Sequence, residues 1–220
     1  SKHIQSKKKD KILLIQNKAL ELSLFLSIPA SIALVVGSEY IISALFGYGS
    51  FNEVAVRNSA KALYFFALGL PAFSLIKIFS SFFFANHNTK TPFYISLFSV
   101  ALNIIVSVYY FKEIGFIIIP IATSVSSWIN GILLFIFLKK DNLFNFNKEF
   151  VLRFTKIIFA SVWMGVLFNF LLIYFKEQLT FEQNMKSFYL ILSVMMGLLF
   201  YLFISYWIKA FKISDFKLNY

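Results

Sequence analysis

Polar side chains recur at helical spacing inside two strongly apolar segments in the middle of the chain. The first stripe has steps of three, four and four residues, which places its members on one helical face: Ser96, Ser99, Asn103 and Ser107. The second has steps of four and three: Thr123, Ser127 and Asn130. Such residues commonly form hydrogen bonds that hold helices together in an apolar environment. Alternatively, the oxygens of Asn103, Ser107 and Thr123 line a hydrophilic cavity or a weak monovalent-cation site, since neither stripe has a carboxylate.

One charged side chain, Lys77, lies well inside an apolar segment. It precedes the polar loop at Asn86 by about nine residues, or roughly 13 Å of helix. Ser74 and Ser81 make its face of the helix polar. A charge at such depth is costly and is often functional. We therefore expect one of two roles for Lys77. It lines a cavity for an anionic substrate, with the two serines beside it, or it is a structural cation that binds backbone carbonyls.

Three apolar segments contain a proline beyond their first residue. Pro120 lies close to the start of its segment, whereas Pro29 and Pro71 are more interior. Pro29 and Pro71 have no N–H group, so each frees the carbonyl four residues earlier, which belongs to Phe25 or to Ala67. Both positions predict a kink. The kinks are either simple bends or the hinges of a carrier that works by alternating access.

Motifs for catalysis and for metal binding are absent from the sequence. The two histidines, His3 and His87, are far apart, and there is no cysteine. No apolar segment holds paired acidic residues, and there is no Gly-rich phosphate-binding loop. We therefore expect a protein that is not an enzyme and has no cofactor, apart from a monovalent cation at the polar stripes.

The composition indicates a membrane protein. Of 220 residues, 59% are hydrophobic and only 14% are charged, with a mean hydropathy of +0.76. Ordinary soluble domains carry about 25% charged residues. This chain therefore has too few charged residues to cover the surface of a soluble domain, and intrinsic disorder is excluded for the same reason. Because the chain begins at Ser1 and has no signal peptide, we expect it to be a piece of a longer protein.

Six segments are long and apolar enough to cross a bilayer as helices, which takes about 20 residues. None alternates in polarity as a barrel strand would, so we predict an all-α, polytopic membrane protein with six transmembrane helices. The short link Lys112–Gly115 predicts that the third and fourth are antiparallel neighbours. The segments are Leu20–Val36, Ala62–Phe84, Pro92–Phe111, Phe116–Leu138, Val151–Phe175 and Phe188–Ile208.

The net charge of +11 is distributed unevenly over the connections. Fifteen basic residues fall on one side: Lys2, Lys7, Lys8, Lys9, Lys11, Lys18, Lys90, Lys139, Lys140, Lys148, Arg153, Lys156, Lys209, Lys212 and Lys217. Five fall on the other: Arg57, Lys61, Lys112, Lys176 and Lys186. Basic loops stay in the cytoplasm, so we predict that both ends of the chain are cytoplasmic. The charge thus reports topology and does not predict a nucleic-acid partner.

Small residues follow one face of each of the last two segments. They recur at steps of four: Ser161, Gly165 and Asn169, then Ser193, Gly197, Tyr201 and Ser205. Both stripes predict close contacts between helices. The opposite faces are rich in Phe, Leu and Ile, which suits contact with lipid and equally a groove for an acyl chain.

Several short motifs occur together along the chain. In the stretch from Ala67 these are Leu70-Pro71, Lys77, the aromatic run Phe82–Phe84 and the closing Thr89–Pro92. Upstream, a helix with Pro-Ala is followed by the turn Leu45–Phe51. Downstream the positions are Gly115, Ala122–Ser124, Trp128–Asn130 and the FKISDF motif near the end of the chain. Together these motifs resemble those of the MurJ/MviN family of lipid II flippases, over nearly the whole chain and most strongly from Ile28 to Lys140.

The resemblance implies a bacterial inner-membrane protein that moves undecaprenyl-pyrophosphate-linked lipid II outward. This chain is similar to the last six helices of a two-lobe flippase, so its partners would be membrane lipid, that substrate and the missing N-terminal lobe. Lys77 would carry over from the charged cavity. Asn103 and Thr123 would match a cation site seen in some members, with Ser107 at its acidic or amide position. The last two helices would form a groove for the lipid tail.

The domain organisation that we predict follows from these segments. It comprises a basic cytoplasmic segment at 1–19, a four-helix part of the transport lobe at 20–138, a cytoplasmic loop at 139–150, two final helices at 151–208 and a cytoplasmic tail at 209–220. Alternative functions are a flippase for another lipid-linked glycan of the O-antigen type and a non-transporting scaffold. A membrane glycosyltransferase is disfavoured because no carboxylate cluster is present.

Overall fold

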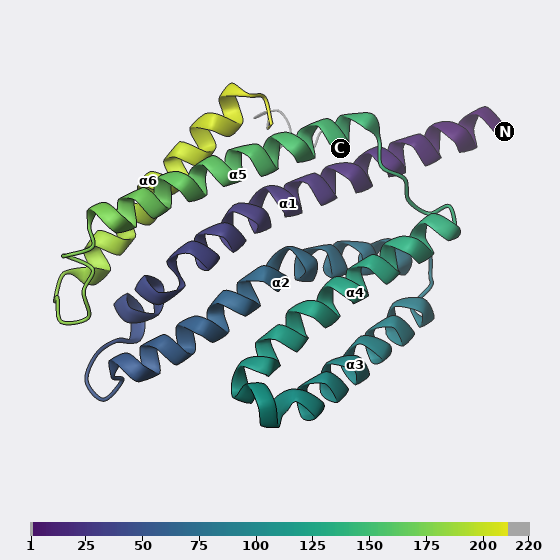
Figure 1. The fold of residues 1–220 in the computed structure, drawn as a ribbon. Helices are drawn as coiled ribbons and strands as arrows, with labels where there is room; N and C mark the ends of the chain where they lie inside the picture. The colour runs from purple at the N-terminus through teal and green to yellow at the C-terminus, as the bar shows by residue number, and fades with distance from the viewer. Residues whose placement is uncertain (1, 211–220) are drawn as a thin grey trace. The chain divides into compact units, whose positions relative to one another are not determined.

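The computed structural model describes residues 2–210, and this part of the chain folds into helices without strands (Figure 1). The all-α prediction is confirmed. The motif at 211–216, with Lys212 and Lys217, lies outside the described residues. The helices are α1 Lys2–Phe46, α2 Glu53–Ala85, α3 Lys90–Ile114, α4 Ile118–Lys140, α5 Lys148–Tyr174 and α6 Lys186–Trp207, with a 3₁₀ turn at Gly115–Ile117.

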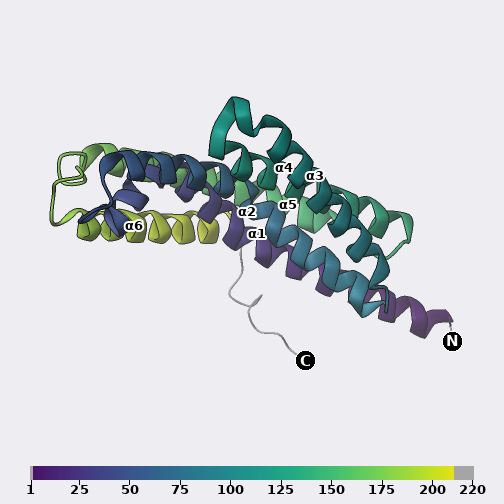
Figure 2. The same cartoon turned by 90° about the horizontal axis from the view of Figure 1, so that it is seen from below.

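Five continuous helical stretches among the described residues are long and apolar enough to cross a membrane. The third, Lys90–Lys140, contains both α3 and α4, because the 3₁₀ turn joins them without a break. Gly115 has a φ of 75° at this turn, a conformation that glycine adopts without strain. α3 and α4 lie side by side, which confirms the predicted antiparallel pair (Figure 1, Figure 2). The count of six spans stays a prediction.

The first helix is longer than the apolar segment predicted at Leu20–Val36. It begins at Lys2 and continues to Phe46, with Pro29 inside it. Lys, Gln, Ile and Leu in its first half are good or tolerable helix formers, so no residue there ends the helix. The basic segment at the N-terminal end and the first apolar segment therefore form one continuous helix.

The described chain separates into two compact units, and the division crosses three helices. Unit 1 holds the chain up to Ser27 together with Gly69–Phe154. Unit 2 holds Ile28–Leu68 and the chain from Thr155 onward. The division thus falls within three residues of Pro29 in α1 and of Pro71 in α2.

Phenylalanine rings form the core at one end of unit 1. Phe144, in the loop after α4, is fully buried, and its ring centroid lies 5.5 Å from that of Phe82 and 6.0 Å from that of Phe79. At the same end, Asn17 of α1 donates to the Asn145 carbonyl at 2.9 Å. Its side-chain oxygen also accepts from the backbone N–H of Asn147 at 3.2 Å. These contacts fasten the loop at 141–147 to α1.

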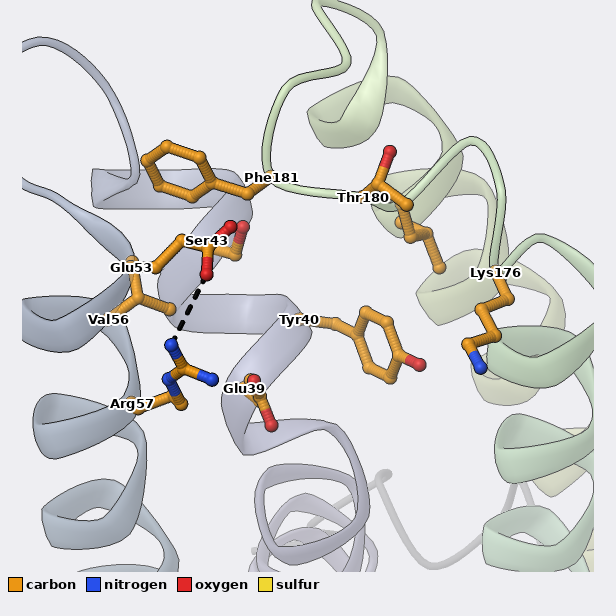
Figure 3. Close-up of a pocket in the computed structure, with 10 residues that line it drawn as sticks. Glu39, Tyr40, Ser43, Glu53, Val56, Arg57, Lys176, Thr180 and Phe181 are labelled. Carbon is orange, nitrogen blue, oxygen red and sulfur yellow. Dashed lines mark hydrogen bonds and ion pairs between the residues drawn. The ribbon is translucent and has the colours of Figure 1, made fainter.

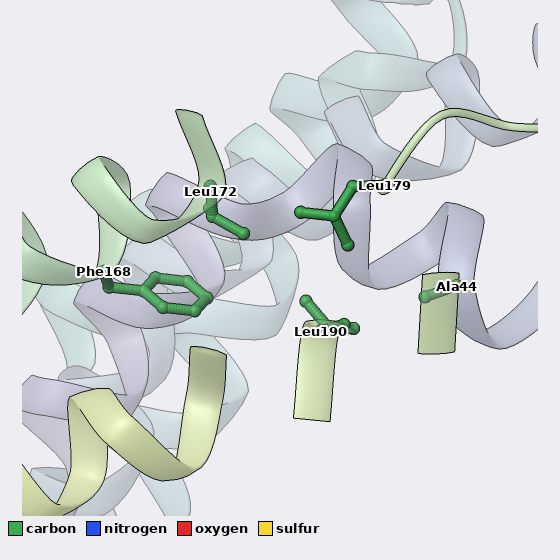
Figure 4. Close-up of a cluster of buried hydrophobic side chains, with 5 residues drawn as sticks. All are labelled: Ala44, Phe168, Leu172, Leu179 and Leu190. Atoms are coloured by element: carbon green, nitrogen blue, oxygen red, sulfur yellow. The ribbon is translucent and has the colours of Figure 1, made fainter. Parts of the chain in front are cut away.

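The core of unit 2 joins the C-terminal half of α1 to α5, α6 and the loop between them. Its buried members are Ala44, Phe168, Leu172, Leu179 and Leu190 (Figure 4). A Cβ on Gly165 of α5 would lie only 2.5 Å from a methyl group of Ile32 in α1, so these helices approach closely. Ser193, Tyr201 and Ser205 are buried, which confirms the predicted contact stripe of α6. In the α5 stripe Ser161 and Gly165 are buried, whereas Asn169 is exposed, so the predicted contact does not extend to Asn169.

Candidate functional site

The two polar stripes meet in a cavity between α3 and α4. The Asn103 amide nitrogen donates to the Thr123 hydroxyl at 3.0 Å and lies 3.4 Å from the Ser126 hydroxyl. The cavity has a volume of about 220 Å³ and is lined by Ser99, Val100, Asn103, Thr123, Ser126, Ser127 and Asn130. Hydrogen bonding between the two helices is therefore confirmed. Ser126 was not recognised in the sequence, because it lies beside the stripe rather than in it.

Most hydroxyl groups in this cavity are already used by their own helix. Ser99 donates to the Ile95 carbonyl at 2.9 Å and Thr123 donates to the Ile119 carbonyl at 2.8 Å. By contrast, the buried side-chain oxygen of Asn130 has no hydrogen-bond partner among the described residues. A buried acceptor without a partner is costly. The cavity thus offers one unsatisfied oxygen beside the Asn103–Thr123 pair.

Ser107 does not join this cavity. It lies four residues beyond Asn103 on α3, is absent from the cavity lining, and has a buried hydroxyl without a partner in the described part of the chain. Of the three residues predicted for a cation site, the structure brings Asn103 and Thr123 together. Among the residues that the structure describes, no group of His, Cys, Asp or Glu side chains has the arrangement of a metal site.

Lys77 is exposed on α2 within unit 1, eight residues before that helix ends at Ala85. It has no hydrogen-bond or ion-pair partner within the described part of the chain. Ser81 is also exposed and donates to the Ile78 carbonyl at 2.7 Å, whereas Ser74 is half-buried. The three residues therefore present a polar strip with one free cation.

The carbonyl that Pro71 frees has a new partner. Ser31 of α1 is buried, and its hydroxyl donates to the Ala67 carbonyl at 2.6 Å. Proline breaks are tolerated in membrane helices where neighbouring side chains satisfy the freed groups in this way. The bond joins α1 and α2 within unit 2, close to Pro29 and Pro71.

Removing this bond is expected to destabilise the protein. Ser31→Ala leaves the Ala67 carbonyl unpaired in an apolar interior, at a cost of about 1 kcal/mol. We expect a lower thermal unfolding midpoint for purified intact protein, measured by size-exclusion chromatography after heating. Ser31→Thr retains the hydroxyl and is the matched control. A midpoint unchanged by Ser31→Ala would show that the bond contributes nothing.

A buried lysine that sequence reasoning placed in a loop lies at the start of α6. Lys186 is 1% exposed, and its Nζ donates to the carbonyls of Gly47 at 2.6 Å and Phe181 at 2.7 Å. The Nζ also lies 4.2 Å from the ring centroid of Tyr48. Nothing in a single sequence distinguishes this lysine from an exposed loop cation.

The next residue extends the same junction. Ser187 donates to the Ala44 carbonyl at 2.7 Å, and its hydroxyl lies 2.7 Å from that of Tyr48. The loop after α1 and the loop before α6 therefore lie at one end of unit 2. This pairing agrees with the predicted topology, which places both loops on one membrane side. Which side is cytoplasmic stays a prediction.

Comparison with known protein families decides what kind of membrane protein carries these features. Residues 1–189 match the family described as "Lipid II flippase MurJ". The chain belongs to the MurJ family. The family resemblance predicted from the motifs is thereby confirmed, and with it a multi-pass membrane protein.

Individual MurJ relatives agree with this assignment. A probable lipid II flippase MurJ of Rickettsia prowazekii is 33% identical over 182 residues, covering 83% of this chain and 35% of that protein. One of Thermotoga maritima is 36% identical over 193 residues, covering 88% of this chain and 37% of that protein. The chain thus spans about a third of the length of these curated relatives.

A solved MurJ structure has the same fold. The protein titled "Lipid II flippase MurJ, inward closed conformation" superposes with a TM-score of 0.74 at 26% identity. The match covers 93% of this chain and 41% of the solved one. The helix order and packing described above are therefore those of part of a MurJ protein.

Proposed function

We propose that this chain is part of a flippase that moves lipid II across the bacterial inner membrane. The observation that carries the proposal is the match of residues 1–189 to the MurJ family. The substrate, an undecaprenyl-pyrophosphate-linked peptidoglycan precursor, comes from the family. Transport of this kind makes and breaks no covalent bond, so we propose a transporter and not an enzyme.

The mechanism that we propose is alternating access, with bending at Pro29 and Pro71. Two observations support these hinges. The division between the compact units falls next to both prolines, and each proline removes a hydrogen bond that would resist bending. The Ser31–Ala67 bond satisfies the freed carbonyl of α2 without restoring a continuous hydrogen-bond ladder. Bending of α1 and α2 is thereby concentrated at these two positions.

Lys77 is the residue that we assign to the substrate cavity, with Ser74 and Ser81 beside it. Its ammonium is exposed and unpaired among the described residues, which suits an anionic pyrophosphate. The rest of the cavity would come from the portion of the protein that the longer relatives contain and this chain does not match. We also propose the topology in which both ends of this chain are cytoplasmic, on the strength of the basic residues.

A monovalent cation is proposed at the Asn103–Thr123 cavity. Sodium is expected to raise the thermal midpoint of the intact protein, whereas choline at equal ionic strength is not. Asn103→Ala should abolish this sodium effect, because it removes the side chain that brings α3 and α4 together there. Ser107→Ala is the control, since Ser107 lies outside the cavity and should leave the effect unchanged. A midpoint insensitive to sodium in the parent protein would contradict the site.

The proposed function is tested by replacement of a known lipid II flippase. Cells depleted of their own lipid II flippase should regain growth when the intact protein carrying this chain is expressed in the membrane. Membrane fractions must show that the protein is present. Lysis despite normal expression would contradict lipid II transport.

A further inference from the structure

A second cavity, of about 290 Å³, lies within unit 2 at the end opposite the proline positions. Its walls are the last turns of α1, the first turn of α2 and the loop after α5 (Figure 3). Helices that cross a membrane end at its surface, so this cavity lies at the level of the lipid headgroups.

Charged groups of both signs face this cavity. Glu39 of α1 and Lys176 of the loop are exposed and have no ion-pair or hydrogen-bond partner among the described residues. Glu53 and Arg57 of α2 also line it, 3.3 Å apart, and balance each other. The lining therefore has no net charge, and it holds an unpaired carboxylate on Glu39 and an unpaired ammonium on Lys176.

A buried hydroxyl also faces this cavity. Ser43 is only 6% exposed, and its hydroxyl oxygen has no hydrogen-bond partner among the described residues. A buried polar group without a partner costs free energy. Ser43 lines the cavity beside the charged groups.

The remaining walls are mostly apolar and are held in place. Val56 and Leu179 are each 3% exposed, and Tyr40, Thr180 and Phe181 complete the lining. The Phe181 carbonyl accepts the Lys186 hydrogen bond, and the Phe181 ring centroid lies 4.5 Å from the Lys186 Nζ. The wall formed by this loop is thus fixed before any ligand arrives, which reduces the entropy lost on binding.

We propose that this cavity binds the zwitterionic headgroup of an aminophospholipid. The ammonium of phosphatidylethanolamine would pair with Glu39, and its phosphate with Lys176. A small headgroup suits the volume, because pockets for larger ligands occupy about 300 to 1,000 Å³. The lining residues belong to unit 2, whereas Lys77 of the proposed substrate cavity belongs to unit 1, and occupation of the site does not depend on transport.

Lipid binding to the purified intact protein tests the assignment. Native mass spectrometry with matched amounts of phosphatidylethanolamine, phosphatidylcholine and phosphatidylglycerol should show severalfold more binding of the first. The choline headgroup has no N–H donor for Glu39, and the glycerol headgroup has no cation. Equal binding of the three lipids, or a preference for phosphatidylglycerol, would overturn the proposal.

Two substitutions locate the site. Glu39→Gln should abolish the preference for phosphatidylethanolamine over phosphatidylcholine, whereas Lys176→Gln should lower the binding of both severalfold. Glu113→Gln and Lys112→Gln, at the exposed end of α3 in unit 1, are the matched controls and should change neither. All four positions are exposed, so the thermal midpoints should stay near that of the parent. A preference that survives Glu39→Gln would overturn the proposal.

Discussion

Lys186→Met is expected to destabilise the protein strongly, and by more than Ser31→Ala or Ser187→Ala. The substitution keeps an unbranched side chain of similar length but removes the donor that serves the carbonyls of Gly47 and Phe181. Each buried carbonyl left unpaired costs about 1 to 3 kcal/mol. Loss of the attraction to the Tyr48 and Phe181 rings adds about 1 kcal/mol. The total loss is about 3 to 7 kcal/mol.

The measurement is the thermal midpoint of the intact purified protein, together with its yield from membranes. Lys176→Met is the matched control, because Lys176 belongs to the same loop but is exposed and should tolerate the change. Ser187→Ala should lie between the two, since it removes one bond to the Ala44 carbonyl. Equal midpoints for Lys186→Met and Lys176→Met would contradict the contribution assigned to the buried ammonium.

Lys77→Ala is expected to abolish support of growth in flippase-depleted cells while leaving the protein folded. Lys77 is exposed and unpaired in the described chain, so its removal should hardly change the thermal midpoint. A charged hydrogen bond to a phosphate is worth about 1.5 to 3 kcal/mol, which corresponds to a loss of tenfold or more in transport. Lys77→Arg retains the charge and should retain part of the activity.

Lys61→Ala provides the control for this prediction. Lys61 is an exposed lysine on the same helix, and we predict that it lies near the other membrane surface, away from the substrate cavity. Its removal should leave growth unchanged. Normal growth of Lys77→Ala cells would assign Lys77 a structural role, whereas poor membrane expression of that variant would show a folding role.

Periodicity in the sequence located most of the residues on the faces that pack, although Asn169 of the α5 stripe is exposed. The polar stripe through Asn103 and the small-residue stripe through Gly165 both lie at helix contacts, as expected. The partners of individual groups were harder to predict. Ser107 shares the stripe of Asn103 yet lies outside the cavity. A stripe specifies which face of a helix is polar. It does not specify at which positions along that face the neighbouring helix also supplies polar groups.

The sequence by itself determined the all-α membrane architecture, the family and the positions of Pro29 and Pro71. These follow from composition, local spacing and short motifs, which do not depend on distant parts of the chain. Only the tertiary structure decided that Ser31 satisfies the Ala67 carbonyl and that Lys186 is buried against Gly47. Both bonds join residues far apart in sequence, 36 and 139 positions respectively. Such partners depend on which helices lie together and in what rotation, which a pattern along one helix does not specify.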